Sequence, residues 1–180
     1  MVNMEYLCII PSPLGDLTIA SDGEYVTGLW TEGSRYYGAT LTAAAEEKYL
    51  PLFSKVSKWL DTYFSGIEPR NMLPLAPPGT LFRKKVWSIL RAIPYGSVTT
   101  YGAIAKQLSA GRENYTLAAQ AVWGAVGHNP ISIIIPCHRV VGANGSLTGY
   151  GGGIDKKFQL LQLEKVNMEN FFIPTKGTAL

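Results

Sequence analysis

The first third of the chain alternates short apolar segments with turn signals. Three segments rich in strand-forming residues occur at Glu5–Ile10, Leu17–Ala20 and Tyr25–Trp30. The dipeptide Asp22-Gly23, which separates the second segment from the third, is typical of tight hairpin turns. This pattern predicts an antiparallel meander of short strands.

A change of hydrophobic period follows these strands. Apolar residues recur at helical spacing, and Pro51 and Gly66 suit the first turn and the end of a helix. The apolar stripe consists of Leu52, Phe53, Val56, Trp59, Leu60, Tyr63 and Phe64. An aromatic stripe of this kind is typical of a core, so we expect the helix to pack on the sheet.

The segment 69–79 divides the chain. It carries four prolines, which exclude a regular helix or a central strand. We therefore predict an N-terminal α/β domain at 1–68, a linker at 69–79, a C-terminal domain at 80–166 and a loosely held tail at 167–180.

After this linker the apolar spacing becomes helical. Thr80, Thr100 and Thr116 each precede such a stretch, and each can accept an N-cap hydrogen bond. The helices predicted after the second and third caps are Tyr101–Leu108 and Leu117–Val126. Two short helices joined by a turn are typical of a helix-turn-helix. The predicted fold class is α+β, with an antiparallel sheet in the N-terminal domain and a mostly helical C-terminal domain.

The second of these two helices is built largely of small residues. Proteins that read the major groove carry long polar side chains toward the base edges, and such side chains are scarce here. The helix could therefore approach DNA closely without sequence preference, for instance in the minor groove. It could equally pack tightly inside its own domain, and the pattern alone does not separate the two interpretations.

The β-branched run Ile131–Pro136 predicts a buried strand that delivers Cys137. The glycine-rich stretch Gly142–Gly153 predicts a loop, and Asp155–Lys165 a final helix.

The composition fits a globular protein, because 47% of the 180 residues are apolar and 16% are charged. No apolar run has the length of a membrane-spanning helix, and the N-terminal sequence lacks the pattern of a secretory signal. The two cysteines are too few for a disulfide framework. We therefore expect a cytoplasmic protein with no membrane partner.

The net charge of +3 hides an asymmetry. Residues 1–78 hold five Lys/Arg and nine Asp/Glu, whereas residues 79–180 hold eleven and four. A basic C-terminal half is attracted to a polyanion such as DNA, although the same charge could simply solubilise the surface.

The residues around Cys137 suggest nucleophilic chemistry. Nearby positive charge or a histidine base lowers the pKa of a thiol and produces the reactive thiolate. Because neighbours on an extended strand point to opposite faces, Cys137 and His138 must lie in a turn or communicate through a water. Glu164 could orient the imidazole as the third member of a triad. Arg139 could face a phosphate or pair with a carboxylate.

An ordered pattern surrounds this cysteine. It consists of Asn129-Pro130, then Pro136-Cys137-His138-Arg139-Val140, then Gly145-Ser146-Leu147-Thr148-Gly149-Tyr150. This pattern resembles the active-site segment of the O6-alkylguanine-DNA alkyltransferases, or methylated-DNA–protein-cysteine methyltransferases. The resemblance covers about 80–165, and Ser12-Pro13-Leu14-Gly15 resembles the opening of the family's first domain more loosely.

The resemblance implies repair of double-stranded DNA that contains alkylated guanine, without a cofactor. The damaged base would be extruded into a pocket, and its O6-alkyl group would move to Cys137 once per molecule, with O4-alkylthymine as a further candidate substrate. His138 would accept the thiol proton through a water, and Glu164 would orient His138. Asn129 would brace the turn before the active-site strand, and Tyr101 would donate toward the base. The further residues implied at the DNA or the flipped base are Thr100, Thr116, Ala118, Ala119, Gln120, Trp123, Arg139, Val140, Tyr150 and Gly151.

Three features depart from the family pattern. Gln120 stands where many members carry an arginine that fills the stack left by the base. Trp123 stands where a glycine is usual, and it could narrow the substrate range, stack on a base or turn inward. The loop 109–115 is longer than in compact members. Some members also bind zinc in the first domain, but one cysteine and no histidine there cannot build a four-ligand site, so we expect no metal.

Three other functions fit parts of the sequence. A lesion-binding module would lack transfer activity, a Cys-His-Glu hydrolase would turn over many times, and a structural DNA-binding protein would be unaffected by blocking Cys137. The basic helix-turn-helix domain and the ordered motif favour the alkyltransferase, which we expect to be a monomer.

Overall fold

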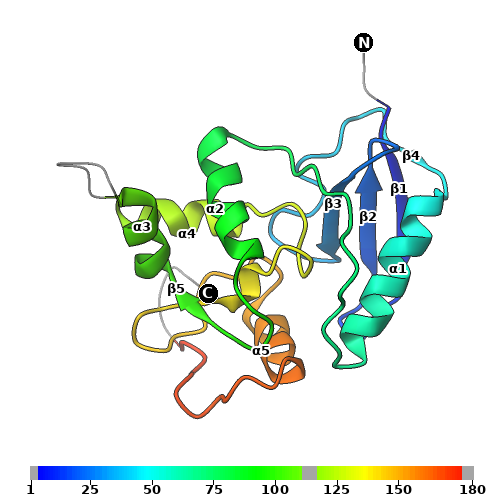
Figure 1. Ribbon diagram of the computed structural model, residues 1–180. Helices are drawn as coiled ribbons and strands as arrows, with labels where there is room; N and C mark the ends of the chain where they lie inside the picture. Colours follow the sequence, from blue (N-terminus) through cyan, green and yellow to red (C-terminus); the bar gives the residue numbers. More distant parts are fainter. Residues whose placement is uncertain (1–3, 111–116, 176–180) are drawn as a thin grey trace. The chain divides into compact units, whose positions relative to one another are not determined.

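The computed structural model describes residues 4–110 and 117–175 (Figure 1). The chain forms two compact units. The first unit comprises Met1–Pro78 together with Pro130–Ser132, and the second comprises Gly79–Asn129 and Ile133–Leu180. Each unit is described by itself below. Among the described residues, no helix is both long enough and apolar enough to cross a lipid bilayer.

A four-stranded sheet forms the centre of the first unit. Its strands are β1 (Tyr6–Ile10), β2 (Leu17–Ser21), β3 (Val26–Thr31) and β4 (Glu46–Glu47), in the order β3-β2-β1-β4. The pairs β1–β2 and β2–β3 are antiparallel, as the alternating turns predicted, and β4 adds a short parallel pairing with β1. Every residue of β2 and β3 is buried, so these strands form the core of the sheet.

The described residues of the first unit form one α-helix, α1 (Pro51–Phe64). Pro51 occupies the first turn of α1, where a backbone N–H would have no partner within the helix. Gly66, which has a positive φ, follows the C-cap residue Ser65. The buried side chains of α1 are Leu52, Phe53, Val56, Leu60 and Tyr63. Five of the seven residues of the predicted stripe are therefore buried, whereas Trp59 and Phe64 are half-buried.

The proline-rich segment is more structured than a linker. Its Leu75 forms a bridge with Val26 of β3, because Val26 N donates to Pro74 O at 2.8 Å and Ala76 N donates to Val26 O at 2.9 Å. Proline lacks only the N–H, so a segment with a non-proline residue at the donating position can still pair with a strand edge. The segment 69–78 thus lies within the first unit.

The described residues of the second unit form four α-helices. They are α2 (Leu81–Arg91), α3 (Tyr101–Ser109), α4 (Ala119–Gly127) and α5 (Ile154–Leu163). The hydroxyls of Thr80 and Thr100 cap α2 and α3 by accepting from Arg83 N and Ala103 N, as predicted. Helix α4 begins two residues later than expected, with Ala118 at the N-cap, and the expected cap Thr116 lies outside the described residues. A buried hydrogen bond of 2.8 Å from Trp87 Nε1 to Ala125 O ties α2 to α4.

The prediction of a strand at 131–136 is wrong. Ile131 forms only an isolated bridge with Leu29, and a turn follows in which Ile133 has a φ of 70°. Ile131, Ile133 and Ile135 are nevertheless fully buried. The β-branched run records burial correctly, but burial does not require an extended backbone.

The described residues of the tail form specific contacts. Phe172 N donates to Gly145 O at 3.1 Å, and Leu147 N donates to Phe172 O at 3.0 Å. Phe171 packs against a core cluster of Val141, Leu147 and Leu161. The described part of the tail therefore braces the loop between Cys137 and α5, contrary to the expectation of a loosely held end.

Candidate active site

Cys137 opens a single turn of 3-10 helix, η1 (Cys137–Arg139). Its N–H donates to Ile135 O at 2.8 Å, and Arg139 N donates to Pro136 O at 3.0 Å. The turn places Cys137 and His138 in non-extended backbone, which is one of the two arrangements that the sequence left open. Cys137 is a free thiol and is 5% exposed.

Asn129, just beyond the end of α4, holds the sulfur. Its Nδ2 donates to Ile135 O at 2.8 Å and to Cys137 Sγ at 3.1 Å. The first bond matches the bracing role expected from the resemblance. The second was not foreseen, and it aims an N–H donor at the atom on which negative charge would develop.

Burial dominates the electrostatics of the thiol. It raises the pKa of Cys137, while the hydrogen bond from Asn129, the charge of Lys157 and the backbone N–H groups of Cys137 and His138 oppose the rise. The resting sulfur is therefore protonated at neutral pH. Thiolate formation in this site needs a nearby proton acceptor.

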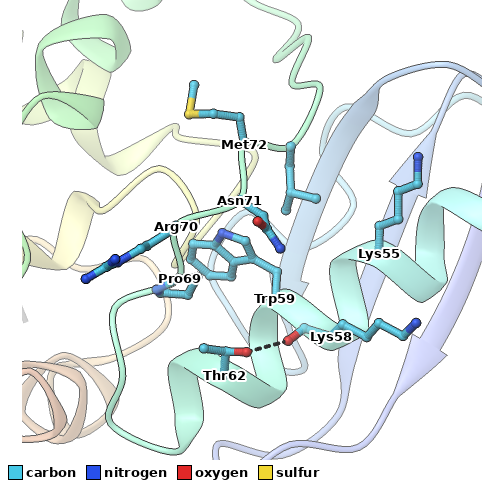
Figure 2. A pocket seen from close by; sticks show the side chains of 9 residues that line it. Lys55, Lys58, Trp59, Thr62, Pro69, Arg70, Asn71 and Met72 are labelled. Carbon is cyan, nitrogen blue, oxygen red and sulfur yellow. Dashed lines mark hydrogen bonds between the residues drawn. The ribbon is translucent and has the colours of Figure 1, made fainter.

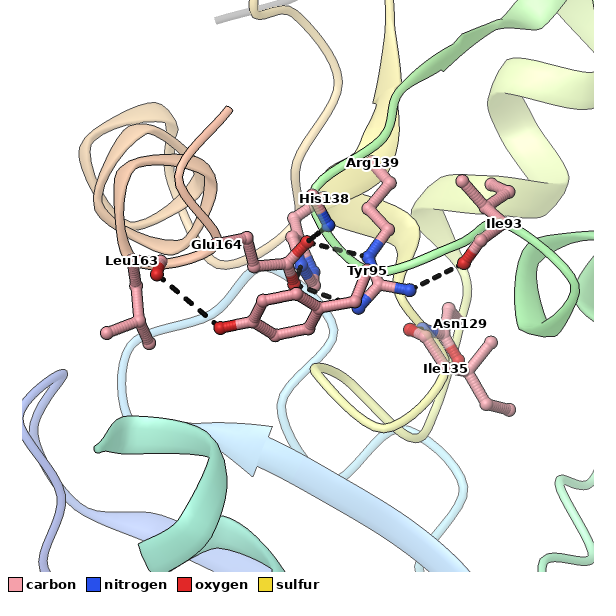
Figure 3. Close-up of polar contacts among 9 residues, drawn as sticks. Ile93, Tyr95, Asn129, Ile135, His138, Arg139, Leu163 and Glu164 are labelled. Carbon is pink, nitrogen blue, oxygen red and sulfur yellow. Dashed lines mark hydrogen bonds and ion pairs between the residues drawn. The ribbon is translucent and has the colours of Figure 1, made fainter. Parts of the chain in front are cut away.

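His138 and Glu164 form a fully buried pair (Figure 3). His138 Nε2 lies 2.6 Å from Glu164 Oε1. Burial lowers the pKa of His138 against the opposing effect of Glu164, so the imidazole is neutral at neutral pH. With Nε2 bound to the carboxylate, Nδ1 is the ring nitrogen that can exchange a proton with another group.

Glu164 accepts hydrogen bonds from three residues on two segments of the second unit. Besides His138, it accepts from Arg139 Nε at 2.8 Å, from Arg139 Nη2 at 3.0 Å and from Gly96 N at 3.1 Å. Burial alone would raise the pKa of Glu164, but the hydrogen bonds and charges of His138 and Arg139 outweigh it and lower the pKa to about 2. The carboxylate is therefore ionised at every physiological pH. Sequence alone would place such a glutamate on the surface, whereas Glu164 is 2% exposed.

The side chain of Arg139 is bound within the second unit. Two of its nitrogens bind Glu164, and Nη1 donates to Ile93 O at 2.6 Å (Figure 3). The guanidinium also lies over the ring of Tyr95, 5.6 Å from its centroid. A buried carboxylate that already accepts from a histidine needs a compensating cation, and Arg139 supplies it. Of the two partners considered for Arg139, the structure shows the carboxylate, and a contact with DNA stays a prediction.

Tyr101 lies at the start of α3 and donates from Oη to Thr148 O at 3.0 Å. Burial, followed by the charge of Cys137, raises the pKa of the phenol, so Tyr101 stays a proton donor. Its neighbour Thr100 is half-buried and uses its hydroxyl as the N-cap of α3.

Lys157 is a site residue that the sequence analysis missed. Its side chain is fully buried, and Nζ donates to Val140 O at 2.5 Å and to Thr148 O at 2.7 Å. Burial lowers its pKa to about 7. A signal was present, because Lys157 shares the helical stripe of Leu160, Leu161 and Glu164, which are all buried.

Trp123 turns toward the loop after Thr148. Gly149 has a φ of 81°, and a Cβ there would lie 2.5 Å from Tyr101 Oη and closer still to Trp123 Nε1. Tyr150 is buried with its ring edge-on to His138, at a centroid distance of 6.5 Å, and Gly151 is half-buried beside it. Tyr101 and Trp123 thus both pack against Gly149, which is followed in the chain by Tyr150, the ring partner of His138.

The beginning of α4 presents a different surface. Ala118, Ala119 and Gln120 are exposed, whereas Trp123, one turn later, is half-buried. Packing inside the domain, one of the two interpretations that the sequence left open, applies to the later part of this helix, and the approach of its first turn to DNA stays a prediction. The first turn is free to approach a partner, and Val122, Ala125 and Val126 are packed inside.

Comparison with known proteins agrees with this geometry. The DNA-binding domain of 6-O-methylguanine DNA methyltransferase matches residues 81–166, and the ribonuclease-like domain of the same family matches residues 6–77. The methylated-DNA–protein-cysteine methyltransferase of Haemophilus influenzae is 45% identical over 89% of this chain and 87% of its own length. That of Mycobacterium tuberculosis is 44% identical over 87% of this chain and 90% of its own length.

Solved structures give the same result. The crystal structure of Mycobacterium tuberculosis OGT in complex with DNA aligns with a TM-score of 0.76 and 42% identity, covering 90% of this chain and 92% of that chain. With both domains matched in order around one buried Cys-His-Glu arrangement, this chain belongs to the 6-O-methylguanine DNA methyltransferase family.

Proposed function

We propose that this protein repairs alkylated DNA by moving the alkyl group from O6 of guanine to Cys137 Sγ. Two sets of buried hydrogen bonds, in a protein of this family, carry the proposal. Asn129 binds the sulfur of Cys137, and Glu164 binds both His138 and Arg139. The relatives named above are methylated-DNA–protein-cysteine methyltransferases, and one solved relative is in complex with DNA.

The reaction is a displacement at the alkyl carbon. His138 takes the thiol proton of Cys137 through its Nδ1, directly or by way of a water, because Nε2 is bound to Glu164. The thiolate attacks the carbon, the C–S bond forms, and the C–O6 bond breaks with its electron pair going to guanine. Guanine then regains one proton, so the sum is thiol plus O6-alkylguanine giving thioether plus guanine.

Each buried group has a role in this scheme. Asn129 Nδ2 donates to the developing thiolate, and Arg139 keeps Glu164 ionised so that the carboxylate can stabilise the imidazolium of His138. Tyr101 releases its bond to Thr148 O and donates to the flipped base. A thioether does not hydrolyse in water at neutral pH, so each protein molecule reacts once. The displacement needs no cofactor.

Double-stranded DNA is the proposed partner, with the first turn of α4 as the contact surface. Ala118 and Ala119 allow close approach, and Gln120 fills the space left by the flipped base. Val140 and the backbone at Tyr150 and Gly151 line the base pocket. We propose that the protein acts as a monomer in a reducing compartment, the cytoplasm, where Cys137 stays a thiol.

Mass spectrometry of the intact protein tests the proposal. The protein is incubated with a duplex that carries one O6-methylguanine, and Cys137→Ser serves as the control. We expect a gain of one methyl group on Cys137, restored guanine in the duplex and no second turnover. Tight lesion binding with no mass change would instead identify a lesion-binding module, and repeated turnover would identify a hydrolase.

A further inference from the structure

The first unit contains a groove that the alkyl-transfer site does not use. It has a volume of about 530 Å³, within the range of about 300–1,000 Å³ that is usual for ligand sites. Residues of α1 and of the segment that follows it form its walls (Figure 2). The lining residues are Lys55, Lys58, Trp59, Thr62, Pro69, Arg70, Asn71, Met72 and Leu73.

Positive charge is concentrated in this groove. Residues 1–78 carry nine acidic and only five basic residues, yet Lys55, Lys58 and Arg70 all line the groove. No acidic residue is among its lining residues. A cationic groove on an otherwise acidic stretch is complementary to an anionic ligand, and it is not explained by a general need for surface charge.

An aromatic surface lies between these cations. The indole of Trp59 is half-buried and stacks on the buried ring of Tyr63, with a centroid distance of 5.6 Å and an interplanar angle of 9°. That stacking holds the indole in one orientation. Figure 2 shows Arg70 on one side of Trp59, and Lys55 and Lys58 on the other.

The rim of the groove adds further apolar and polar contacts. Met72 is 83% exposed, which is unusual for a large apolar side chain, and the amide of the exposed Asn71 offers both a donor and an acceptor. Cations on both sides of an aromatic ring, with an adaptable methionine at the rim, are features of sites that bind a single nucleic-acid strand.

We propose that this groove binds a short segment of single-stranded DNA. Lys55, Lys58 and Arg70 contact successive phosphates, and an unpaired base lies against Trp59 and Met72. A duplex does not fit this chemistry, because its base faces are already stacked and cannot reach the indole. The site is independent of the reaction at Cys137, so its failure would leave the proposed function untouched.

Indole N–H signals test this proposal in the intact protein. The chain has four tryptophans, so a 15N-labelled sample gives one indole signal each for Trp30, Trp59, Trp87 and Trp123. The probes are a short oligothymidylate and thymidine monophosphate. We expect the oligothymidylate to shift the Trp59 signal in a saturable, salt-sensitive manner while the Trp30 signal stays in place.

A matched pair of variants separates the groove from general electrostatics. Lys55→Gln/Lys58→Gln removes two charges from the groove, and Arg35→Gln/Lys48→Gln removes two from the remaining basic residues of 1–78. We expect the first variant to weaken the binding reported by Trp59 roughly tenfold and the second to change it little.

Three outcomes would overturn the proposal. One is a Trp59 signal that does not move with the oligothymidylate. Another is equal weakening in both double variants, which would leave only long-range attraction. The third is equal affinity for thymidine monophosphate and the oligothymidylate, which would identify a mononucleotide pocket.

Discussion

Glu164 Oε1 lies 2.6 Å from His138 Nε2, and both side chains are fully buried. The carboxylate thereby fixes which ring nitrogen of His138 faces the rest of the site. Arg139 binds the same carboxylate on two nitrogens, so a buried positive charge balances the negative one. Catalytic geometry and the stability of the second unit therefore depend on the same three residues.

Replacing the carboxylate should slow transfer strongly. In Glu164→Gln, the amide keeps the size of the side chain but cannot stabilise a protonated His138, so we expect the rate of methyl transfer to fall by about 10²–10⁴. Single-turnover transfer from an O6-methylguanine duplex measures this rate. Thermal unfolding of the same sample shows whether the variant is folded, and an unchanged rate in a folded variant would remove Glu164 from the proton relay.

Lys157 should make stability depend on pH. Its pKa falls from 10.5 in the unfolded chain to about 7 in the folded protein, so between these values the unfolded chain binds more protons. The penalty for burying this lysine is fully present below pH 7 and disappears as the pH approaches 10.5.

We therefore expect the free energy of unfolding of the wild type, relative to Lys157→Met, to rise across this window. Urea titrations at successive pH values give the difference, in which groups common to both proteins cancel. A difference that does not change with pH would mean that Lys157 stays charged when buried.

Gly149 should not tolerate a side chain. Its φ of 81° is costly for alanine, and the added Cβ would collide with Tyr101 Oη and the indole of Trp123. In Gly149→Ala we expect both side chains to shift and the transfer rate to fall roughly tenfold to a hundredfold. Gly153→Ala provides the control, because Gly153 also has a positive φ but no atom lies within 4 Å of its added Cβ. Equal transfer rates for the two variants would show that backbone strain, and not the collision with Tyr101 and Trp123, lowers the rate.

Two adjacent phenylalanines in the tail should differ in importance. Phe171 packs against the cluster of Val141, Leu147 and Leu161, whereas Phe172 is 47% exposed and contributes through its backbone. We expect Phe171→Ala to lower the free energy of unfolding by about 1–3 kcal/mol and Phe172→Ala to lower it by less than about 0.5 kcal/mol. Chemical denaturation of the two variants compares them, and similar losses would argue against the bracing role of the tail.

Gln120 should limit DNA affinity. It is exposed in the first turn of α4, where an added charge can reach a phosphate or the base stack. We expect Gln120→Arg to bind a lesion-containing duplex more tightly and to steepen the slope of log affinity against log salt by about one. Fluorescence anisotropy at several salt concentrations measures both quantities. Gln107→Arg on α3 is a control of equal charge, and an equal gain there would reduce the effect to net charge.

The sequence predicted those parts of the fold that depend on local rules. The caps at Thr80 and Thr100 and the stripe of α1 follow from hydrogen bonding and helical periodicity, which act over a few residues. The run at 131–136 was misassigned because its burial comes from tertiary packing, while its backbone turns at Ile133.

Tertiary contacts also decide which site residues could be predicted from the sequence. Cys137, His138 and Asn129 lie close together in the chain, and an ordered motif marks them. The carboxylate pairing of Arg139 and the buried position of Lys157 arise from contacts between segments further apart in the chain, such as Glu164 with Arg139 and Val140 with Lys157. Single-sequence patterns favour the exposed position that most charged residues occupy, and they miss a charge whose partner comes from elsewhere in the fold.

The bridge between β3 and Ile131 constrains how this protein can be made and divided. Leu29 N donates to Pro130 O at 2.8 Å and Ser132 N donates to Leu29 O at 2.9 Å, so three residues from late in the chain complete the first unit. During synthesis, β3 lacks this neighbour until more than half of the second unit has left the ribosome. In a gene fragment that ends at Pro78, Leu75 could still pair with Val26, but the part of the β3 edge at Leu29 would be unpaired, and an unpaired strand edge is prone to pair with other chains. We therefore expect that the first unit cannot be produced in complete form from residues 1–78 alone, although each unit has its own core.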